Sequence, residues 1–296
     1  MKYDIKVISL LVSIFFISQI VGLSILYKDM TVRIVEGKTE IVHSETVIGP
    51  RPEFYGIQTF IWVFSAILIT TGLLLLLMKF GKIDWIKLLI FTACFITISV
   101  TLGVFIVSYL AFLIAFILAV IKVYKPNMFT HNLSEMLIYS GLALILVPLF
   151  DLTWMIALLV FISVYDIYAV FKSKHMIKMA VYQAKSKMFT GLLIPVKRVK
   201  KSIKAGKKKT HELTEAIIGS GDVAFPLMFS GVVMERMIKI GEISKEIAFL
   251  KTLIIPVIVS IVLLFLLMKG RRGKFYPGMP FITAGCLLGY VLVSII

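Results

Sequence analysis

The chain has 296 residues, of which 59% are hydrophobic and 16% are charged, and its mean hydropathy is +1.00. Soluble domains carry about 25% charged residues, so this composition excludes an ordinary soluble fold and indicates an integral membrane protein. The fold class we expect is all-α, because lipid offers no hydrogen-bond partner to an open backbone. The net charge of +16 does not indicate nucleic-acid binding, since 13 of the 32 Lys and Arg residues lie between Lys172 and Lys209 and most others flank apolar runs.

Apolar runs long enough to cross a bilayer, about 20 residues each, predict about nine transmembrane helices. In chain order they cover approximately Val7–Tyr27, Ile57–Met78, Trp85–Thr101, Leu102–Tyr124, Leu133–Phe150, Leu152–Phe171, Leu213–Glu235, Ile247–Met268 and Pro277–Ile296. Only Thr101 and Gly103 mark the boundary between the third and fourth spans, and only Asp151 marks that between the fifth and sixth. Cys94 and Cys286 both lie inside apolar runs, so we expect free core thiols and no disulfide framework.

The basic residues predict the orientation in the membrane. With the N-terminus in the cytoplasm, 24 Lys and Arg residues fall on the cytoplasmic side and 8 on the outside. Because positive charge favours the cytoplasmic side, this division predicts an odd number of spans with the C-terminus outside. A multi-pass protein of the cell membrane is the expected localisation.

Two connections exceed the length of a tight turn. The external segment Lys28–Gly56 is rich in Val, Ile and Thr and is expected to form a small hairpin. The basic cytoplasmic loop 172–213 carries an apolar patch, Met188–Val196, which we expect to lie along the inner interface against anionic headgroups. The whole of 1–296 is then one membrane domain, with spans one to six in 1–171 and spans seven to nine in 214–296.

Two aspartates stand in these apolar runs, Asp166 in the sixth span and Asp222 in the seventh. A carboxylate at bilayer depth costs about 2.5–3.5 kcal/mol on insertion scales, so each implies a partner, a cavity or a chemical role. Asp166 precedes Lys172 by six residues and Asp222 follows Leu213 by nine, which places both in the cytoplasmic half of antiparallel neighbours. Two carboxyls that meet share one proton and titrate as a pair.

Such a pair suits hydrolysis of a peptide bond by an aspartic mechanism, with no metal or cofactor: one carboxylate activates water and the protonated partner polarises the scissile carbonyl. Gly219, Ser220 and Gly221 precede Asp222, and glycine lets backbone approach closely. Pro226 removes the amide that would bond to the Asp222 carbonyl.

Further along, Tyr165 directly precedes Asp166, where it would gate the site, hydrogen-bond near it or pack. Pro277, Gly278, Met279 and Pro280 open the last span, where two close prolines predict an extended or loosely wound entry. Its backbone groups would pair with an incoming strand by β-augmentation.

At these residues the chain resembles the presenilin and signal peptide peptidase family of intramembrane aspartyl proteases, most of all its archaeal presenilin homologues. The family pattern is Tyr-Asp in the sixth span, Gly-x-Gly-Asp in the seventh and Pro-Ala-Leu at the ninth. Here these read Tyr165-Asp166, Gly219-Ser220-Gly221-Asp222 and Pro277-Gly278-Met279-Pro280. Ser220 replaces a larger apolar residue, and Gly278-Met279 replace Ala-Leu. The resemblance implies that the substrate is a single transmembrane helix of N-out orientation, which must unwind before attack.

Other interpretations of the two aspartates stay open at this point. The alternatives are a proton- or cation-coupled transporter, a buried polar pair that holds helices together, and a prepilin-peptidase-like protease. A zinc protease is unsupported because no His-Glu-x-x-His occurs, and Ser220 has no intramembrane histidine to act as its base. Glu135 and Glu215 are expected in first helical turns, where negative charge is favourable.

Overall fold

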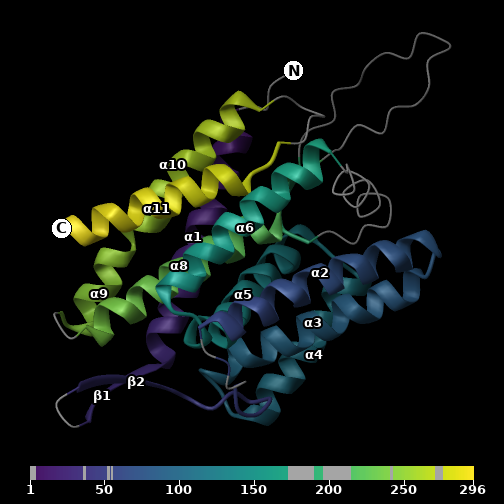
Figure 1. Ribbon diagram of the computed structural model, residues 1–296. Helices are drawn as coiled ribbons and strands as arrows, with labels where there is room; N and C mark the ends of the chain where they lie inside the picture. Colours follow the sequence, from purple (N-terminus) through teal and green to yellow (C-terminus); the bar gives the residue numbers. More distant parts are fainter. Residues whose placement is uncertain are drawn as a thin grey trace, which may run out of the picture.

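The computed structural model describes residues 5–35, 38–51, 54, 56–172, 190–195, 215–240, 243–270 and 276–296. The helices and strands are α1 (Ile5–Asp29), β1 (Met30–Val35), β2 (Lys38–His43), α2 (Ile57–Lys79), α3 (Ile83–Gly103), α4 (Ser108–Tyr124), α5 (Met128–Leu146), η1 (Val147–Leu149), α6 (Leu152–Phe171), β3 (Leu192–Pro195), β4 (Glu215–Ile218), α8 (Ser220–Lys239), α9 (Lys245–Thr252), α10 (Ile254–Lys269) and α11 (Met279–Ile295). Figure 1 shows that the helices form one bundle with a two-stranded hairpin at one end.

The helices confirm the expected all-α membrane architecture. Six of them, counted within the described residues, are long and apolar enough to cross a membrane: α1, α2, α3, α5 with η1, α6 and the α9–α10 pair. The shorter helices α4 and α11 are also apolar. Both thin boundaries are breaks in the structure, since α3 ends at Gly103 and Asp151 caps α6 by accepting a hydrogen bond from the Trp154 amide.

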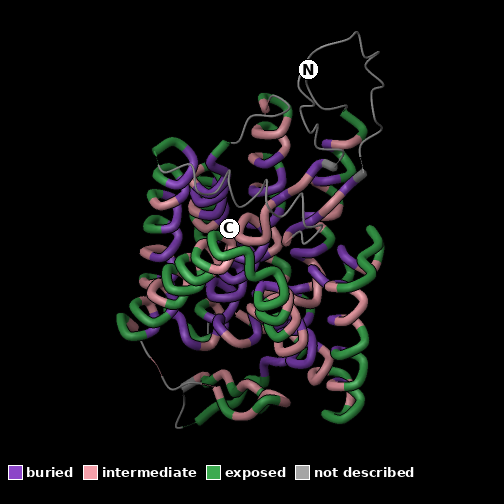
Figure 2. Tube along the Cα trace, turned by 90° about the vertical axis from the view of Figure 1, so that its right-hand side faces the viewer, coloured by how far each residue is buried: buried purple, intermediate pink, exposed green. Residues whose placement is uncertain are grey.

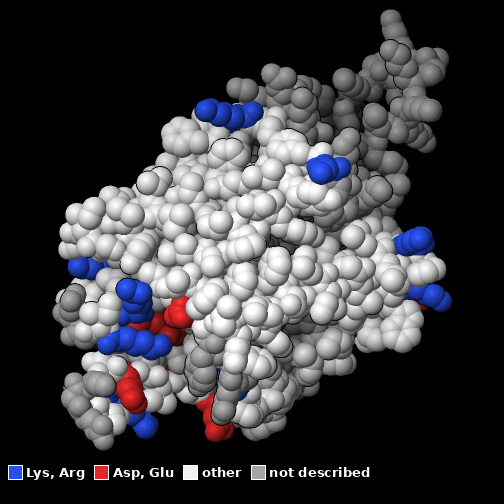
Figure 3. Space-filling view, in the orientation of Figure 1, with Lys and Arg blue, Asp and Glu red and all other residues white. Residues whose placement is uncertain are grey.

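Apolar side chains cover the outside of the bundle. Helix α2 is the extreme case, since only Thr59 and Val63 of its 23 residues are buried. Figure 2 shows exposed residues along the outer faces of the helices and buried ones between them, and Figure 3 shows a broad face without charged side chains. A surface of this kind is stable in lipid and not in water.

Helix α8 lies at the centre of the bundle, where it contacts α1, α5, α6, α10 and α11. Packing against it depends on small residues on its neighbours and on α8 itself, as at Gly231, where an added Cβ would press on Leu26 and Val147. Gly285 and Gly289 likewise let α11 approach the backbone of α10. Cys94 and Cys286 are free and buried, as expected.

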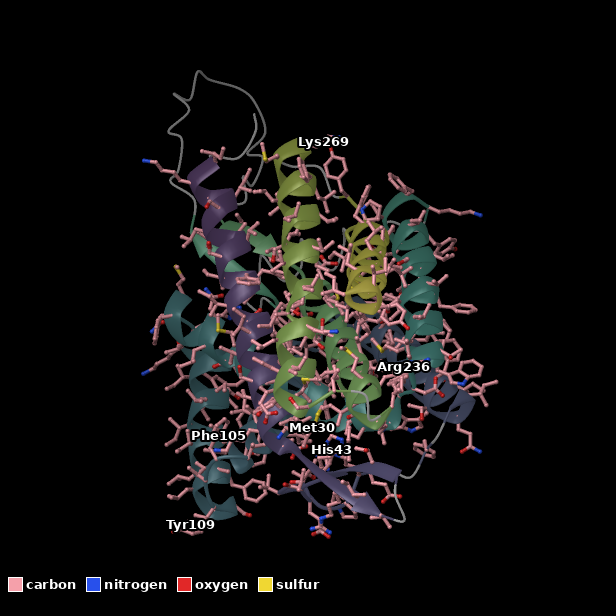
Figure 4. The ribbon with its side chains drawn as sticks, turned by 90° about the vertical axis from the view of Figure 1, so that its left-hand side faces the viewer. Met30, His43, Phe105, Tyr109, Arg236 and Lys269 are labelled. Carbon is pink, nitrogen blue, oxygen red and sulfur yellow. The ribbon has the colours of Figure 1, made fainter. Side chains whose placement is uncertain are left out.

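The hairpin expected between the first two spans is present as β1 and β2, which pair antiparallel from Met30↔His43 to Val35↔Lys38. His43 joins this hairpin to two helices: its Nδ1 lies 2.8 Å from Asp29 Oδ2 at the end of α1, and its Nε2 lies 2.9 Å from Glu235 Oε1 on α8. Arg51 Nη2 also lies 3.1 Å from Asp29 Oδ2, and Lys239 Nζ lies 3.0 Å from Glu235 Oε2. Figure 4 shows Met30 and His43 at this end of the bundle, opposite Lys269.

A second hairpin, β3–β4, corrects two expectations. The seventh span does not begin at Leu213, because residues Glu215–Ile218 form a strand paired antiparallel with Leu192–Pro195 and the helix starts at Ser220. Glu215 therefore lies in a strand and not in a first helical turn. The described part of the apolar patch is likewise a strand, in which Leu192 and Ile194 are buried in the protein core. The rest of the basic loop, apart from Lys172 and residues 190–195, lies outside the described residues.

Glu135 is also placed differently from the expectation. It lies in the second turn of α5, where it is 2% exposed, and its Oε1 accepts a hydrogen bond from Lys122 Nζ on α4 at 2.6 Å. Burial of a carboxylate requires such a partner. The pair joins α4 to α5 inside the bundle.

Candidate active site

Asp166 lies five residues before the end of α6 and is 4% exposed. One turn earlier, Ser163 Oγ lies 2.8 Å from Thr283 Oγ1 on α11, and both side chains are buried. Hydroxyl contacts between helices in lipid contribute about 0.6–2 kcal/mol. This contact holds α6 against the N-terminal half of α11 and so fixes the direction in which Asp166 faces.

Asp222 occupies the first turn of α8, not the middle of a span, because β4 and the extended residue Gly219 precede the helix. Gly219 adopts φ −60° and ψ 147°, and a Cβ added to it would lie 3.3 Å from Asp222 Oδ2. Negative charge in a first turn interacts favourably with the helix dipole. The local sequence thus places this carboxyl at the end of a helix beside exposed backbone amides.

Pro226 and Gln19 shape the backbone that carries Asp222. Pro226 lies inside α8 and has no amide to give the Asp222 carbonyl. The next carbonyl, that of Val223, accepts a hydrogen bond of 2.8 Å from Gln19 Nε2 on α1. Gln19 was not predicted as a site residue, although a glutamine inside an otherwise apolar first span is a signal that points to it.

The turn before α11 brings the two carboxyls together. Gly278 caps α11, and the Met279 amide donates a hydrogen bond to Asp166 Oδ2 at 3.1 Å. A Cβ added to Gly278 would lie 2.9 Å from Asp222 Oδ1 and 3.0 Å from Asp222 Oδ2. One side of this turn therefore touches Asp166 and the other touches Asp222, and the two side chains are close enough to interact electrostatically.

At least one carboxyl oxygen of the pair lacks a hydrogen-bond partner among the described residues. Asp166 Oδ1 is buried and has no hydrogen-bond partner in the described part of the chain. Asp222 keeps partial exposure, while Asp166, Pro277, Gly278 and Met279 are buried. No group of three or more His, Cys, Asp or Glu side chains among the described residues is arranged to hold a metal ion.

The other expected residues are near this pair in different ways. Ser220 begins α8, and Gly221 has only the Phe225 ring within van der Waals distance of an added Cβ. Tyr165 is half-buried directly before Asp166.

The loosely wound entry predicted for the last span is restricted to its first residues. Pro277 and Gly278 are not helical, whereas Met279 and Pro280 form the first turn of α11. The Gly278 carbonyl already accepts hydrogen bonds from the amides of Phe281 and Ile282.

Comparisons with known proteins identify the family of the chain. The family profile described as signal-peptide peptidase, presenilin aspartyl protease matches residues 12–296. A crystal structure of a presenilin family intramembrane aspartate protease in space group C222 superposes with a TM-score of 0.61 at 17% identity, covering 97% of this chain and 98% of that one. Another, in space group P2, gives 0.60 at 16% identity, with 96% of each chain covered. No curated protein sequence matches the chain. Since the family profile covers nearly the whole sequence, the chain belongs to the signal-peptide peptidase and presenilin family of intramembrane aspartyl proteases.

Proposed function

We propose that Asp166 and Asp222 are the catalytic dyad of this protease and that it cleaves transmembrane helices of other membrane proteins. The observation that carries the proposal is the position of Gly278 and Met279 beside the carboxyls: the Met279 amide bonds to Asp166 Oδ2, and a Cβ on Gly278 would lie within 3.0 Å of both oxygens of Asp222. Acids from two different helices meet at one turn of a third. Glu235, the other acid of α8, is matched by His43 and Lys239, whereas the charged group that faces Asp222 is another carboxylate.

The chemistry follows from this pairing. A carboxylate of the pair takes a proton from water as the water oxygen attacks the scissile carbonyl carbon, and the protonated partner donates its proton to the carbonyl oxygen. The tetrahedral intermediate then collapses: the C–N bond breaks, the amine nitrogen takes the proton of the pair, one hydroxyl of the intermediate returns its proton to the pair as the new carbonyl forms, and a new carboxyl and a new amine leave. The dyad finishes with one proton again.

The turn before α11 orients the pair. The Met279 amide holds Asp166 Oδ2, which leaves the unpartnered Oδ1 for water or for the substrate carbonyl. Gly278 lets the backbone come against Asp222 without a side chain between them. Fixing reacting groups in this way accounts for a large part of enzymatic rate enhancement.

The substrate must offer an extended segment, because helical carbonyls are already bonded and shielded. We propose that the unwound segment lies beside the turn Pro277–Pro280 and pairs with backbone near the dyad by β-augmentation. The carbonyl of Gly278 and the amide of Met279 are engaged within the protein, so this turn supplies few free groups of its own. We propose that the nearby strand β4 supplies more of the backbone groups that pair with the substrate.

The predicted arrangement in the cell membrane completes the proposal: nine spans, a cytoplasmic N-terminus, an external C-terminus and the dyad in the cytoplasmic half. Lys269 and the β1–β2 hairpin lie at opposite ends of the bundle (Figure 4), which suits the assignment of Lys269 to the cytoplasmic side and of the hairpin to the outside. The basic loop 172–213 would then face anionic lipid.

A cleavage assay tests the proposal. The purified protein is reconstituted in vesicles with a generic single-span peptide, and products are identified by mass spectrometry. Asp166→Ala and Asp222→Ala should each abolish cleavage, and a transition-state mimic of aspartic proteases should block the wild type. Asp84→Ala is the control, because Asp84 is an exposed carboxylate at the start of α3. Cleavage that persists in either dyad variant would show that the pair is not catalytic.

A further inference from the structure

Two consecutive residues near the start of α5 form hydrogen bonds to the backbone of β3 and of the residue before it. The Asn132 side-chain amide donates from Nδ2 to the Leu193 carbonyl and accepts at Oδ1 from the Leu193 amide, each at 2.9 Å. Next to it, His131 Nε2 donates to the Gly191 carbonyl at 2.8 Å. His131 is 3% exposed and Asn132 is 7% exposed. We call His131 and Asn132 the α5 clasp.

The α5 clasp determines which edge of the hairpin is free. Leu193 pairs with Ile217, and both backbone groups of Leu193 point at Asn132. In an antiparallel pair this makes Leu193 and Ile217 a non-hydrogen-bonded pair, so the amide and carbonyl of Ile217 point away from β3. Ile217 has no hydrogen-bond partner at that edge in the described part of the chain. Asn132 therefore covers the outer edge of β3 and leaves the edge of β4 for an added strand.

Buried charge holds the clasp in place. Glu135 lies one turn after His131, with its Oε1 3.7 Å from His131 Nε2, and Lys122 on α4 bonds to the same oxygen. The imidazole thus lies between a buried carboxylate and the Gly191 carbonyl. Because Lys122 and Glu135 are 3% and 2% exposed at their side chains, neither can move into water without breaking the pair.

The gripped strand is in direct contact with the segment that carries Asp222. Gly191 has φ +119°, and a Cβ there would collide with the Ile218 carbonyl oxygen and lie 3.2 Å from the Ser220 amide nitrogen. Ile218 pairs with Leu192, and Gly219 then leads into α8. A continuous set of contacts runs from α5 through β3 and β4 to the first turn of α8.

We infer that His131 and Asn132 are positioning residues that determine which peptide bond is cleaved. This inference rests on the proposed function. By fixing β3, the α5 clasp fixes β4 relative to the dyad, so a substrate strand added along Ile217 presents one peptide bond to Asp166 and Asp222. Without the clasp the hairpin is free to shift, and strand register is specified only where contacts impose it. The bound strand then meets the carboxyls at more than one position.

The test compares products and rates in reconstituted vesicles with the same single-span peptide. Asn132→Leu removes both bonds to Leu193 at similar volume, and His131→Leu removes the bond to Gly191. Each should lower kcat about 10-fold to 100-fold, as small displacements of reacting groups do, change KM by less than twofold, and add cleavage positions beside the wild-type one. His131→Gln keeps a donor for Gly191 and should recover most of the wild-type product pattern. If Asn132→Leu does not fold, Asn132→Asp takes its place: it keeps an acceptor for the Leu193 amide and puts a carboxylate oxygen in place of the Nδ2 donor.

Thr59→Val is the matched control. Thr59 Oγ1 also makes a buried bond to backbone, 3.0 Å to the Leu149 carbonyl, but far along the chain from β3. It should lower the melting temperature without adding cleavage positions. The inference is overturned if the Asn132 and His131 variants keep wild-type kcat and a single cleavage position, or if Thr59→Val broadens the products equally. Its failure is distinct from that of the proposed function, which fails only if Asp166→Ala or Asp222→Ala still cleaves.

Discussion

The two ends of α8 carry acids in opposite surroundings. Near the β1–β2 hairpin, Glu235 is 2% exposed and lies against His43 and Lys239. At the other end, the charged group that faces Asp222 is Asp166. An acid matched by cations holds structure together, whereas two acids brought together without a cation cost stability, and a protein retains them where the chemistry needs both. The contrast along one helix is the one expected between a structural carboxylate and the catalytic carboxylate proposed here.

The contrast predicts opposite effects on stability, and this is the largest effect we expect. Glu235→Gln leaves His43 and Lys239 without their counter-charge and should lower the free energy of unfolding by about 3 kcal/mol. Asp222→Asn removes a like charge and should leave the free energy of unfolding unchanged or raise it, while cleavage is lost. Thermal unfolding in detergent, followed by circular dichroism, measures both. Equal destabilisation by the two substitutions would remove the distinction between the ends.

A substitution at Gly278 tests the Asp222 end of α8 separately from the Glu235 end. Gly278→Ala places a Cβ about 3 Å from both Asp222 oxygens, so the carboxyl must move. Displacement of a catalytic group by about 1 Å costs about 100-fold in rate, and we expect that loss in kcat with little change in melting temperature. Gly72→Ala, at a position on α2 with no atom within 4 Å of the new Cβ, is the control and should match the wild type. Normal cleavage by Gly278→Ala would contradict the geometry of the turn.

The smallest predicted effect is a pH dependence at the hairpin end. Burial lowers the pKa of His43, but the hydrogen bond to Asp29 and the carboxylate of Glu235 outweigh it, so the pKa of His43 is raised above its ordinary value. Arg51 and Lys239, the basic groups that bond to these two carboxylates, oppose the shift only in part. Because the pKa of His43 is raised in the folded state, protonated His43 stabilises the fold fully below its unfolded pKa of about 6.5. This stabilisation is lost as the pH rises through the pKa of His43 in the folded protein.

His43→Gln measures this effect directly. The difference in melting temperature between wild type and His43→Gln should be largest at pH 6, equivalent to about 2 kcal/mol, and should shrink as the pH is raised toward 9. Lys239→Gln, which removes the other basic partner of Glu235, is the comparison and should show a smaller difference. A difference for His43→Gln that does not change with pH would mean that His43 is neutral in the folded protein.

Much of this fold follows from the length of apolar runs, because a bilayer sets the length of a helix and forbids open backbone. Even the thin breaks at Gly103 and Asp151 lie where the sequence predicts them. The predicted start of the seventh span, at Leu213, was wrong for a physical reason. Ala216, Ile217 and Ile218 are apolar and continuous in sequence with the helix that follows, so they read as its first turn. Only a strand more than twenty residues earlier in the chain makes them a strand.

The site was predictable to a different degree. Asp166, Asp222 and the turn at Gly278 stand out because charge and paired prolines are rare in apolar runs, and the structure brings all three together. His131 and Asn132 do not stand out in this way, since their roles depend on backbone groups of residues far away in the chain. A hydrogen bond from a side chain to a distant carbonyl leaves no pattern in a single sequence. The same is true of the pairing between Lys122 and Glu135.

The proline of α8 has a mechanical consequence. Pro226 leaves the Asp222 carbonyl without its amide partner, so the first turn of α8 is tied to the rest of the helix by fewer bonds than any later turn. Glu235 lies thirteen residues beyond Asp222, about 20 Å along the axis, and is locked by His43. The Asp222 end of this helix can therefore move while the Glu235 end is held by His43, and under the proposed function the motion that accompanies hydrolysis would be limited to this first turn.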